Sequence, residues 1–400
     1  MIPLTMWAQN NTNSPYTRYG YGELADRSFG AGRAMGGLGF GMRSNRQINP
    51  MNPASYTSTD SLTFLFDFGI AGQLSWFDDG TNREKHMNGN LEYAAIQFPV
   101  HRRIALSAGL LPYTYVGYDY GSTQTSADGI TYIERFTGSG GLNEFYAGLS
   151  LDLWKKRLSI GANASYLFGR IAHNQLMTLD GTTNNQSHYQ TLQVNDIKLT
   201  LGIQYTQQLS ASEHYTLGLA FSPAKQLNTT SSDIIVNGGA GTADTVQVTN
   251  SVFDLPNTLG TGISYVKQNK LTLGADFLYE TWGQARYFDQ KGQLKNRMRL
   301  ALGSEFIPNH QNRNIFSRIR YRAGLRYSNS YLQINNNSYN EYGASIGFGI
   351  PFVDNRSFLN LSFEYVKIKP DTRILIDEQY FRFTVNYTFN ERWFFQRKVD

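Results

Sequence analysis

Near its C-terminus the chain reads Gln379-Tyr-Phe-Arg-Phe-Thr-Val-Asn-Tyr-Thr-Phe389, and this alternating stretch decides the fold class. Apolar residues occupy every second position from Phe381 onward, and polar residues from Arg382 onward fill the positions between them. Because successive side chains of a strand point to opposite faces, the stretch predicts a strand with one apolar and one polar face. A half-buried strand of a soluble sandwich would have the same pattern, so this stretch alone leaves both folds open.

The same alternation recurs along the chain in about fourteen segments, most of them long enough to cross a bilayer obliquely. An even number of antiparallel strands is typical of bacterial outer-membrane barrels. The sequence therefore predicts an all-β fold, a transmembrane antiparallel β-barrel of about 14 strands that occupies residues 61–400. The predicted strands are 62–76, 91–99, 104–117, 142–154, 157–172, 191–209, 215–226, 246–266, 271–286, 295–308, 316–331, 339–352, 357–368 and 378–389.

The gaps between the predicted strands are alternately short and long. Outer-membrane barrels have short periplasmic turns and longer outer loops, whereas a soluble sandwich has no reason to keep that alternation. The pattern places both termini on the periplasmic side. The predicted long loops are 77–90, 118–141, 173–190, 227–245, 287–294, 332–338 and 369–377.

The segment 62–76 assigns the two faces of the wall. One face is apolar throughout, and we expect it to meet lipid; the other carries Asp67 and Gln73, with Leu65 as its one large apolar exception. We expect this second face to meet water or the N-terminal segment. Charged residues of the lumen are interpreted as pairs that brace that segment against the wall, in preference to an ion path. They are Asp67, Asp152, Glu144, Arg322 and Arg326.

The composition supports the barrel and excludes other classes. The 400 residues include 26 tyrosines, 25 phenylalanines and no cysteine, and the mean hydropathy is −0.41. Many aromatic residues in an otherwise polar chain suit aromatic girdles around a wet interior. No apolar run of helical membrane-spanning length is present. The net charge of +5 comes without a basic stripe, so nucleic acid is not an expected partner.

The N-terminal part divides into two regions before the barrel. Residues 1–8 resemble the end of a signal peptide cleaved between Ala8 and Gln9, with a plain N-terminal extension as the alternative. Residues 9–60 do not alternate, and they are rich in glycine, asparagine and arginine. Apolar residues such as Met35, Leu38 and Ile48 are poor choices for a solvated tail, so we expect a plug inside the lumen rather than a disordered tail.

One predicted strand contains a proline in its middle. Pro112 falls in the third strand, within Leu110-Leu-Pro-Tyr-Thr-Tyr-Val-Gly117. Proline cannot donate to the ladder and belongs at an edge or a bulge, and a closed barrel has no edge. The sequence therefore predicts a bulge, a kink or a local gap at this point.

The N-terminal region resembles the hatch segment of the FadL family of outer-membrane transporters. The resemblance lies in a glycine-rich motif and a following Asn-Pro-Ala, and its Arg-Ala-Met-Gly pattern is similar to the branch of the family found in Bacteroidetes. That branch is similar in fold to barrels that are subunits of larger machines, including type IX secretion and barrel assembly. The plug-motif residues are Gly30, Gly32, Arg33, Ala34, Gly36, Asn52, Pro53 and Ala54.

The resemblance implies a 14-stranded barrel with an N-terminal hatch and a kinked third strand that opens a lateral passage through the wall. Pro112 and Gly117 are then the candidate lateral opening. The first functional hypothesis is a passive channel for small hydrophobic molecules in the outer membrane of a Gram-negative bacterium, with outer-membrane lipid as a partner. The alternative is a non-transporting subunit or scaffold of a multi-protein outer-membrane machine that binds other outer-membrane or periplasmic proteins.

No catalytic or cofactor-binding pattern accompanies these features. The six histidines are scattered, without the close pairs that a metal site needs, and the glycine-rich run lacks the lysine of a phosphate loop. We therefore expect no enzyme, no metal and no cofactor. The predicted loops at 175–191 and 229–249 are rich in Thr, Asn, Gln, Ser and Gly, which suits protein contact or solvation better than a landing site for hydrophobic ligands.

Overall fold

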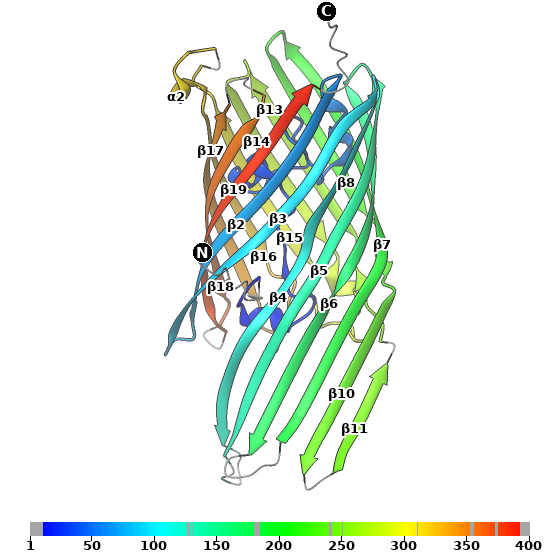
Figure 1. The fold of residues 1–400 in the computed structure, drawn as a ribbon, viewed down its shortest axis with the longest axis vertical. Coiled ribbons are helices and arrows are strands. Elements are labelled where there is room, and N and C mark those ends of the chain that lie inside the picture. The colour runs from blue at the N-terminus through cyan, green and yellow to red at the C-terminus, as the bar shows by residue number, and fades with distance from the viewer. Residues whose placement is uncertain are drawn as a thin grey trace, which may run out of the picture.

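The wall of the molecule is a closed antiparallel barrel (Figure 1). The ladder closes because the last strand pairs with the first, from Asp377↔Asp78 to Arg392↔Thr63. The prediction of a 14-stranded all-β barrel is thus confirmed. The wall strands are β2 (Thr63–Asp78), β3 (Arg83–His101), β4 (Ile104–Thr125), β5 (Thr131–Trp154), β6 (Leu158–Leu179), β7 (Asn185–Ser210), β8 (Glu213–Ser222), β13 (Thr258–Lys267), β14 (Leu271–Glu280), β15 (Arg297–Phe306), β16 (Arg320–Asn329), β17 (Tyr339–Pro351), β18 (Phe358–Pro370) and β19 (Asp377–Arg392).

Shorter elements precede the wall or connect its strands. The computed structural model describes residues 11–125, 129, 131–179, 185–239, 242–249, 251–309, 311–352, 356–372 and 375–392, so the predicted signal-peptide remnant lies outside the described residues. None of the described helices is long and apolar enough to cross a membrane. The short elements are η1 (Pro15–Arg18), β1 (Glu23–Leu24), α1 (Gly30–Ala34), η2 (Pro53–Ser58), β9 (Lys225–Gln226), β10 (Thr229–Gly239), β11 (Thr242–Thr249), β12 (Asp254–Leu255), η3 (Trp282–Gln284) and α2 (Ile315–Arg318).

The alternation of faces seen in the sequence is present in the barrel. Along β2 the side chains of Phe66, Phe68 and Ile70 are exposed outward, whereas Asp67 and Leu65 are fully buried inside. The inward Leu65, which breaks the sequence pattern, belongs to a buried apolar cluster that also contains Phe29, Ile48 and Tyr56 of the N-terminal segment. An apolar residue on the polar face is therefore explained by what it packs against.

Four of the predicted long loops, 77–90, 118–141, 173–190 and 227–245, are wrong, because most of each continues as paired strand. In the first of them β3 begins at Arg83. β4 continues to Thr125 and pairs with β5, which begins at Thr131. β6 and β7 are paired in the same way as far as Leu179 and from Asn185. Residues 229–239 form β10, which pairs with β7. Figure 1 shows these strands projecting well beyond the rest of the wall. Many side chains of these extensions are polar on both faces, so the sequence there lacks the alternation of apolar and polar residues that indicates a strand.

Two further strand boundaries differ from the prediction. Residues 246–249 belong to β11, and wall strand β13 begins only at Thr258, two residues after Pro256. β14 ends at Glu280, because residues 282–284 turn as η3. Pro256 lacks the N–H that a ladder position needs, which accounts for the late start of β13.

The N-terminal segment, residues 11–61, is bonded to strands from widely separated parts of the wall. The backbone N–H groups of Gly39 and Phe40 donate to the Asp276 carboxylate on β14, at 2.6 and 2.9 Å. Gly30 N–H donates to the Tyr93 hydroxyl on β3, at 2.9 Å. In Figure 1 the segment, drawn in dark blue, lies behind and between the wall strands. Wall side chains thus satisfy backbone groups that have no ladder of their own.

The outward face can be tested at the centre of its apolar run on β7. Leu201 is exposed on that face, and we expect Leu201→Arg to lower the free energy of unfolding by about 2–4 kcal/mol, because a cation must then lie in the hydrocarbon. Leu201→Met is the matched control and should change little. Denaturant unfolding in liposomes measures both, and equal stability of the two variants would show that this face does not meet lipid.

Candidate functional site

The ladder between β3 and β4 stops halfway along both strands. It runs from His101↔Ile104 to Ala94↔Leu110, whereas β3 continues outward to Arg83 and β4 to Thr125. On its other edge β4 shifts register with β5 between Pro112 and Thr114. The irregularity expected at Pro112 is therefore present, next to a part of the wall where the described residues of β3 and β4 do not pair.

The N-terminal segment takes the place of β3 along the free edge of β4. β1 pairs with β4 through Glu23↔Tyr115 and Leu24↔Thr114, and the next residue, Ala25, donates its N–H to the Tyr113 carbonyl at 3.0 Å. Further along the same edge, the hydroxyl of Thr17 lies 3.2 Å from both the carbonyl oxygen and the backbone nitrogen of Gly117. The backbone of β4 from Tyr113 to Gly117 is thus bonded to the N-terminal segment.

This close approach depends on a glycine that the sequence analysis did not select. Gly22 has a φ of +90°, and a Cβ atom built on it would lie 2.3 Å from the Tyr115 carbonyl oxygen. Any other residue would push the segment away from β4. A Tyr-Gly-Tyr-Gly run at residues 19–22 is the only sequence signal for it.

The first half of the predicted plug motif forms α1 and its C-terminal turn. Arg33 is buried and paired with Glu92, a residue of β3 that bulges out of register with β2. The Ala34 carbonyl accepts a hydrogen bond from Ser345 on β17 at 3.0 Å. A Cβ atom on Gly36 would lie 2.7 Å from the Leu325 carbonyl, so this turn rests directly on the backbone of β16.

The second half of the motif, Asn52-Pro53-Ala54, contacts a different part of the wall. The Asn52 side chain accepts from Ala54 N–H and donates to the Phe40 carbonyl at 2.9 Å and to the Ile203 carbonyl at 3.2 Å. Glycine at position 202 of β7 makes room, since a Cβ there would lie 2.2 Å from the Asn52 amide oxygen. The first half of the motif therefore attaches the segment to β16–β17 and, through Arg33 and Glu92, to the part of β3 that no longer pairs with β4, while the second half attaches it to β7.

Ion pairs join the remaining N-terminal residues to the lumen wall. Glu144 on β5 accepts from Arg27 at 2.8 Å and from Lys198 on β7 at 2.9 Å. Asp26 lies 2.9 Å from Arg299 on β15 and 3.3 Å from Arg326 on β16. Of these six side chains, all except Arg27 are nearly inaccessible to solvent, so the charges are held by one another rather than by water.

The expected bracing role holds for two of the five predicted charges. Glu144 and Arg326 pair with the N-terminal segment, as described above. Arg322 instead pairs with Glu305 on the neighbouring strand at 2.7 Å, and Asp152 accepts from the backbone of Lys156 in a short turn. Asp67 accepts from Asn386 and Tyr93 within the wall. The sequence analysis missed Asp26, Arg27, Lys198 and Arg299, because nothing local distinguishes them from solvated charges.

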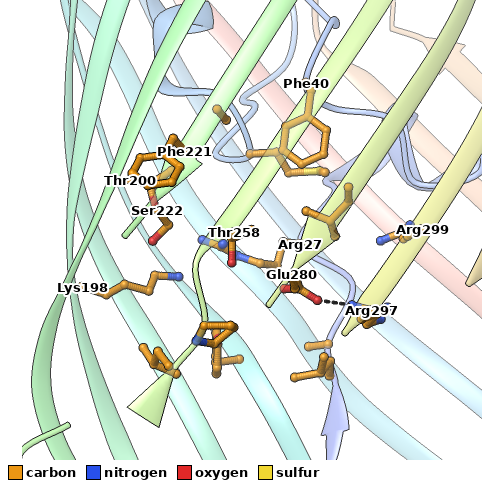
Figure 2. A pocket seen from close by; sticks show the side chains of 18 residues that line it. Arg27, Phe40, Lys198, Thr200, Phe221, Ser222, Thr258, Glu280, Arg297 and Arg299 are labelled. Atoms are coloured by element: carbon orange, nitrogen blue, oxygen red, sulfur yellow. Dashed lines mark hydrogen bonds and ion pairs between the residues drawn. The ribbon is translucent and has the colours of Figure 1, made fainter. Parts of the chain in front are cut away.

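A cavity of about 70 Å³ lies between the N-terminal segment and strands β7, β8, β13 and β14 (Figure 2). Its wall is apolar at Phe40, Met51 and Leu278, while Lys198, Arg27 and Glu280 also border it. Figure 2 shows Glu280 bonded to Arg297, at 3.1 Å. A cavity lined in this way can hold a small amphiphilic molecule. Among the described residues, no three His, Asp or Glu side chains are grouped closely enough to hold a metal ion.

Solved structures share the fold of this closed fourteen-stranded barrel. The chain is similar in structure to the toluene transporter TbuX of Ralstonia pickettii, with 15% identity and a TM-score of 0.60, over 92% of this chain and 99% of that one. A FadL homologue of Pseudomonas aeruginosa has 13% identity and a TM-score of 0.61, and the match covers 92% of this chain and 99% of that one. The monoaromatic hydrocarbon channel CymD has 13% identity and a TM-score of 0.58, and the match covers 92% of this chain and 98% of that one.

These likenesses are to the fold, since the identities are low. The chain belongs to the BamG family, whose model matches residues 1–400. No curated protein sequence matches it. The resemblance to FadL-type barrels is thus confirmed at the level of the fold, and assignment to the Bacteroidetes branch stays a prediction.

The ion-pair network gives a stability prediction. We expect Glu144→Ala to lower the free energy of unfolding by about 3–5 kcal/mol, because it leaves Arg27 and Lys198 without their shared carboxylate in a buried place. Asp119→Ala, which breaks an exposed pair with Arg135, is the control and should have a small effect. Denaturant unfolding compares them, and a Glu144→Ala variant as stable as Asp119→Ala would contradict the bracing role.

Proposed function

We propose that this protein is a closed outer-membrane barrel that serves as a subunit of a larger membrane assembly, rather than a freely open channel. The observation that carries the proposal is the bonding of residues 17–25 along β4, where the third strand breaks. In lipid an unpaired backbone group costs several kcal/mol, so these bonds favour a filled break over an open one. Residues 9–60 then act as a plug and seal.

The projecting sheet supports the role of a binding subunit. β4 to β7 and β10 extend beyond the closed wall, and apolar side chains such as Ile133 and Tyr189 are exposed on the outward face of that extension. A wall that needs only to span a membrane has no use for these extra residues. An exposed sheet with mixed polar and apolar positions suits contact with another outer-membrane or periplasmic protein.

A passive channel for small hydrophobic molecules, with lateral exit near the third strand, is the second candidate. The fold of the hydrocarbon channels and the break beside Pro112 favour it. Movement through such a channel would be diffusive, driven by transfer of apolar surface from water to lipid. The path would require residues 17–25 to leave the edge of β4. The outer membrane is the location that suits both candidates, since closed β-barrels of this kind cross that membrane.

The seal predicts a gain of permeability in one variant. Ala25→Pro removes the N–H that donates to the Tyr113 carbonyl, and Ala25→Gly keeps it. In liposomes we expect the wild-type barrel to take up a fluorescent hydrophobic probe no faster than protein-free liposomes, and Ala25→Pro to be several-fold faster. Uptake by the wild-type barrel well above the protein-free background would overturn the closed state and favour the channel.

The assembly role predicts partners that depend on the projecting sheet. We would delete residues 122–134 of the β4–β5 hairpin and join the strands through an Asn-Gly turn. Removal of residues 291–292, at an exposed turn between β14 and β15, is the control. Purified from native membranes in mild detergent, the wild type and the control should retain a stoichiometric partner, and the hairpin variant should lose it while still folding as a barrel. A wild-type protein that purifies alone would contradict the proposal.

A further inference from the structure

The wall has a second discontinuity, between β7 and β8. Their ladder runs from Ser210↔Glu213 to Leu201↔Phe221, and β7 next pairs on this edge with β10, at Val194↔Thr229. Pro223 follows the last residue of β8, so the strand cannot continue in the ladder. Asn195 N–H still donates to the Asn228 carbonyl at 3.3 Å, and residues 196–200 of β7 are left without a backbone partner on this edge among the described residues.

Side chains partly replace the missing ladder. The Leu199 carbonyl accepts from the Ser222 hydroxyl at 2.6 Å, and the Ile197 carbonyl accepts from the Lys225 ammonium at 2.7 Å. A ladder brings two backbones side by side, whereas these bonds are made by single side chains that reach across. The wall here is therefore less continuous than elsewhere along β7.

The cavity described above reaches this discontinuity. Phe221 is 39% exposed and follows Leu217 and Leu219 on the outward face of β8, yet it also borders the cavity. Thr200, which faces inward from β7, borders the same cavity. Figure 2 shows Phe221, Thr200 and Ser222 together at one side of it. Residues of both β7 and β8 beside the unpaired stretch thus border the cavity.

The cavity is also bordered by a residue whose buried hydroxyl group has no hydrogen-bond partner among the described residues. Thr200 is only 5% exposed, and its hydroxyl has no hydrogen-bond partner among the described residues. A buried hydroxyl without a partner is destabilising unless a ligand or an ordered water bonds to it. Lys198 is the nearest cation along β7, with its Nζ 4.8 Å from the centre of the Tyr113 ring. Phe40, Met51 and Leu278 supply the apolar part of the lining.

We propose that this cavity binds the hydrocarbon chain of an amphiphile that enters from the membrane between β7 and β8, with its polar end directed to Thr200. The outward residues around the discontinuity, Ile197, Leu199 and Leu201, are all apolar and exposed, so hydrocarbon is what lies outside it. The chain belongs either to a membrane phospholipid or to a free amphiphile. Leu24, Ala25 and Tyr113, which lie at the break in β4, also border the cavity, but the entrance proposed here is between β7 and β8. The inference does not rest on either function proposed above.

Photo-cross-linking from inside the lumen tests the proposal. p-Benzoylphenylalanine would replace Leu278, which borders the cavity, in proteoliposomes that contain alkyne-tagged phosphatidylethanolamine. The same replacement at Phe277, exposed on the outward face, is the positive control, and at Met35, fully buried in another luminal cluster, the negative control. We expect tagging at positions 278 and 277 and at least ten-fold less at position 35.

A second arm supplies alkyne-tagged hexadecanoic acid to liposomes of untagged lipid. Tagging at position 278 by the phospholipid assigns the chain to membrane lipid, and tagging by the free acid alone assigns it to a free amphiphile. Thr200→Trp, which fills the cavity beside the discontinuity, should abolish tagging at position 278 and leave position 277 unchanged. The proposal is overturned if neither reagent tags position 278 while position 277 is tagged, if position 35 is tagged equally, or if Thr200→Trp has no effect. None of these results depends on whether the Ala25 variants change permeability.

Discussion

A barrel in lipid depends on one constraint, which is that every backbone N–H and C=O of the wall must find a partner inside the protein. Thirteen ladders between successive wall strands, together with the β19–β2 ladder that closes the barrel, provide most of these partners. Among the described residues, the ladder with the neighbouring wall strand is interrupted along β4 beyond Leu110 and along β7 from residue 196 to residue 200. At the first place a strand of the N-terminal segment supplies the missing partners, and at the second place individual side chains do so. The first interruption is therefore closed by backbone hydrogen bonds, and the second is bridged by side-chain hydrogen bonds.

The buried ion pairs bear on the position of the N-terminal segment along the wall. A segment that lies across a barrel on backbone bonds alone could shift along β4, because ladder positions are alike. Asp26 between Arg299 and Arg326, and Arg27 on Glu144, fix its register, since a shifted segment would leave buried charges without partners. Buried pairs of this kind are weak sources of net stability. We therefore interpret them as determinants of where the segment lies rather than as the reason that the barrel is stable.

The sequence predicted the wall well because lipid on one side and a polar lumen on the other force a period of two. Phe381 to Phe389 and Leu201 needed no tertiary information. Alternation disappears where both faces meet water, so the extensions of β4 to β7 looked like loops. Of the site, the sequence indicated the irregularity at Pro112, whose chemistry is local, and the bracing charges Glu144 and Arg326. Asp26, Gly22 and Thr200 matter because of residues far away in sequence, and a single sequence does not record those contacts.

Low identity with the hydrocarbon channels is compatible with a shared wall, because a ladder constrains the backbone and only the polarity of side chains. In this barrel the two breaks are filled in different ways. Backbone bonds from residues 23–25 close the break at the third strand, and opening it would require those bonds to be replaced together. The break beside Thr200 is bridged by side chains, which can move one at a time. A path for hydrocarbon between membrane and lumen therefore meets less resistance between β7 and β8 than at Pro112, although Pro112 is the residue that the sequence makes conspicuous.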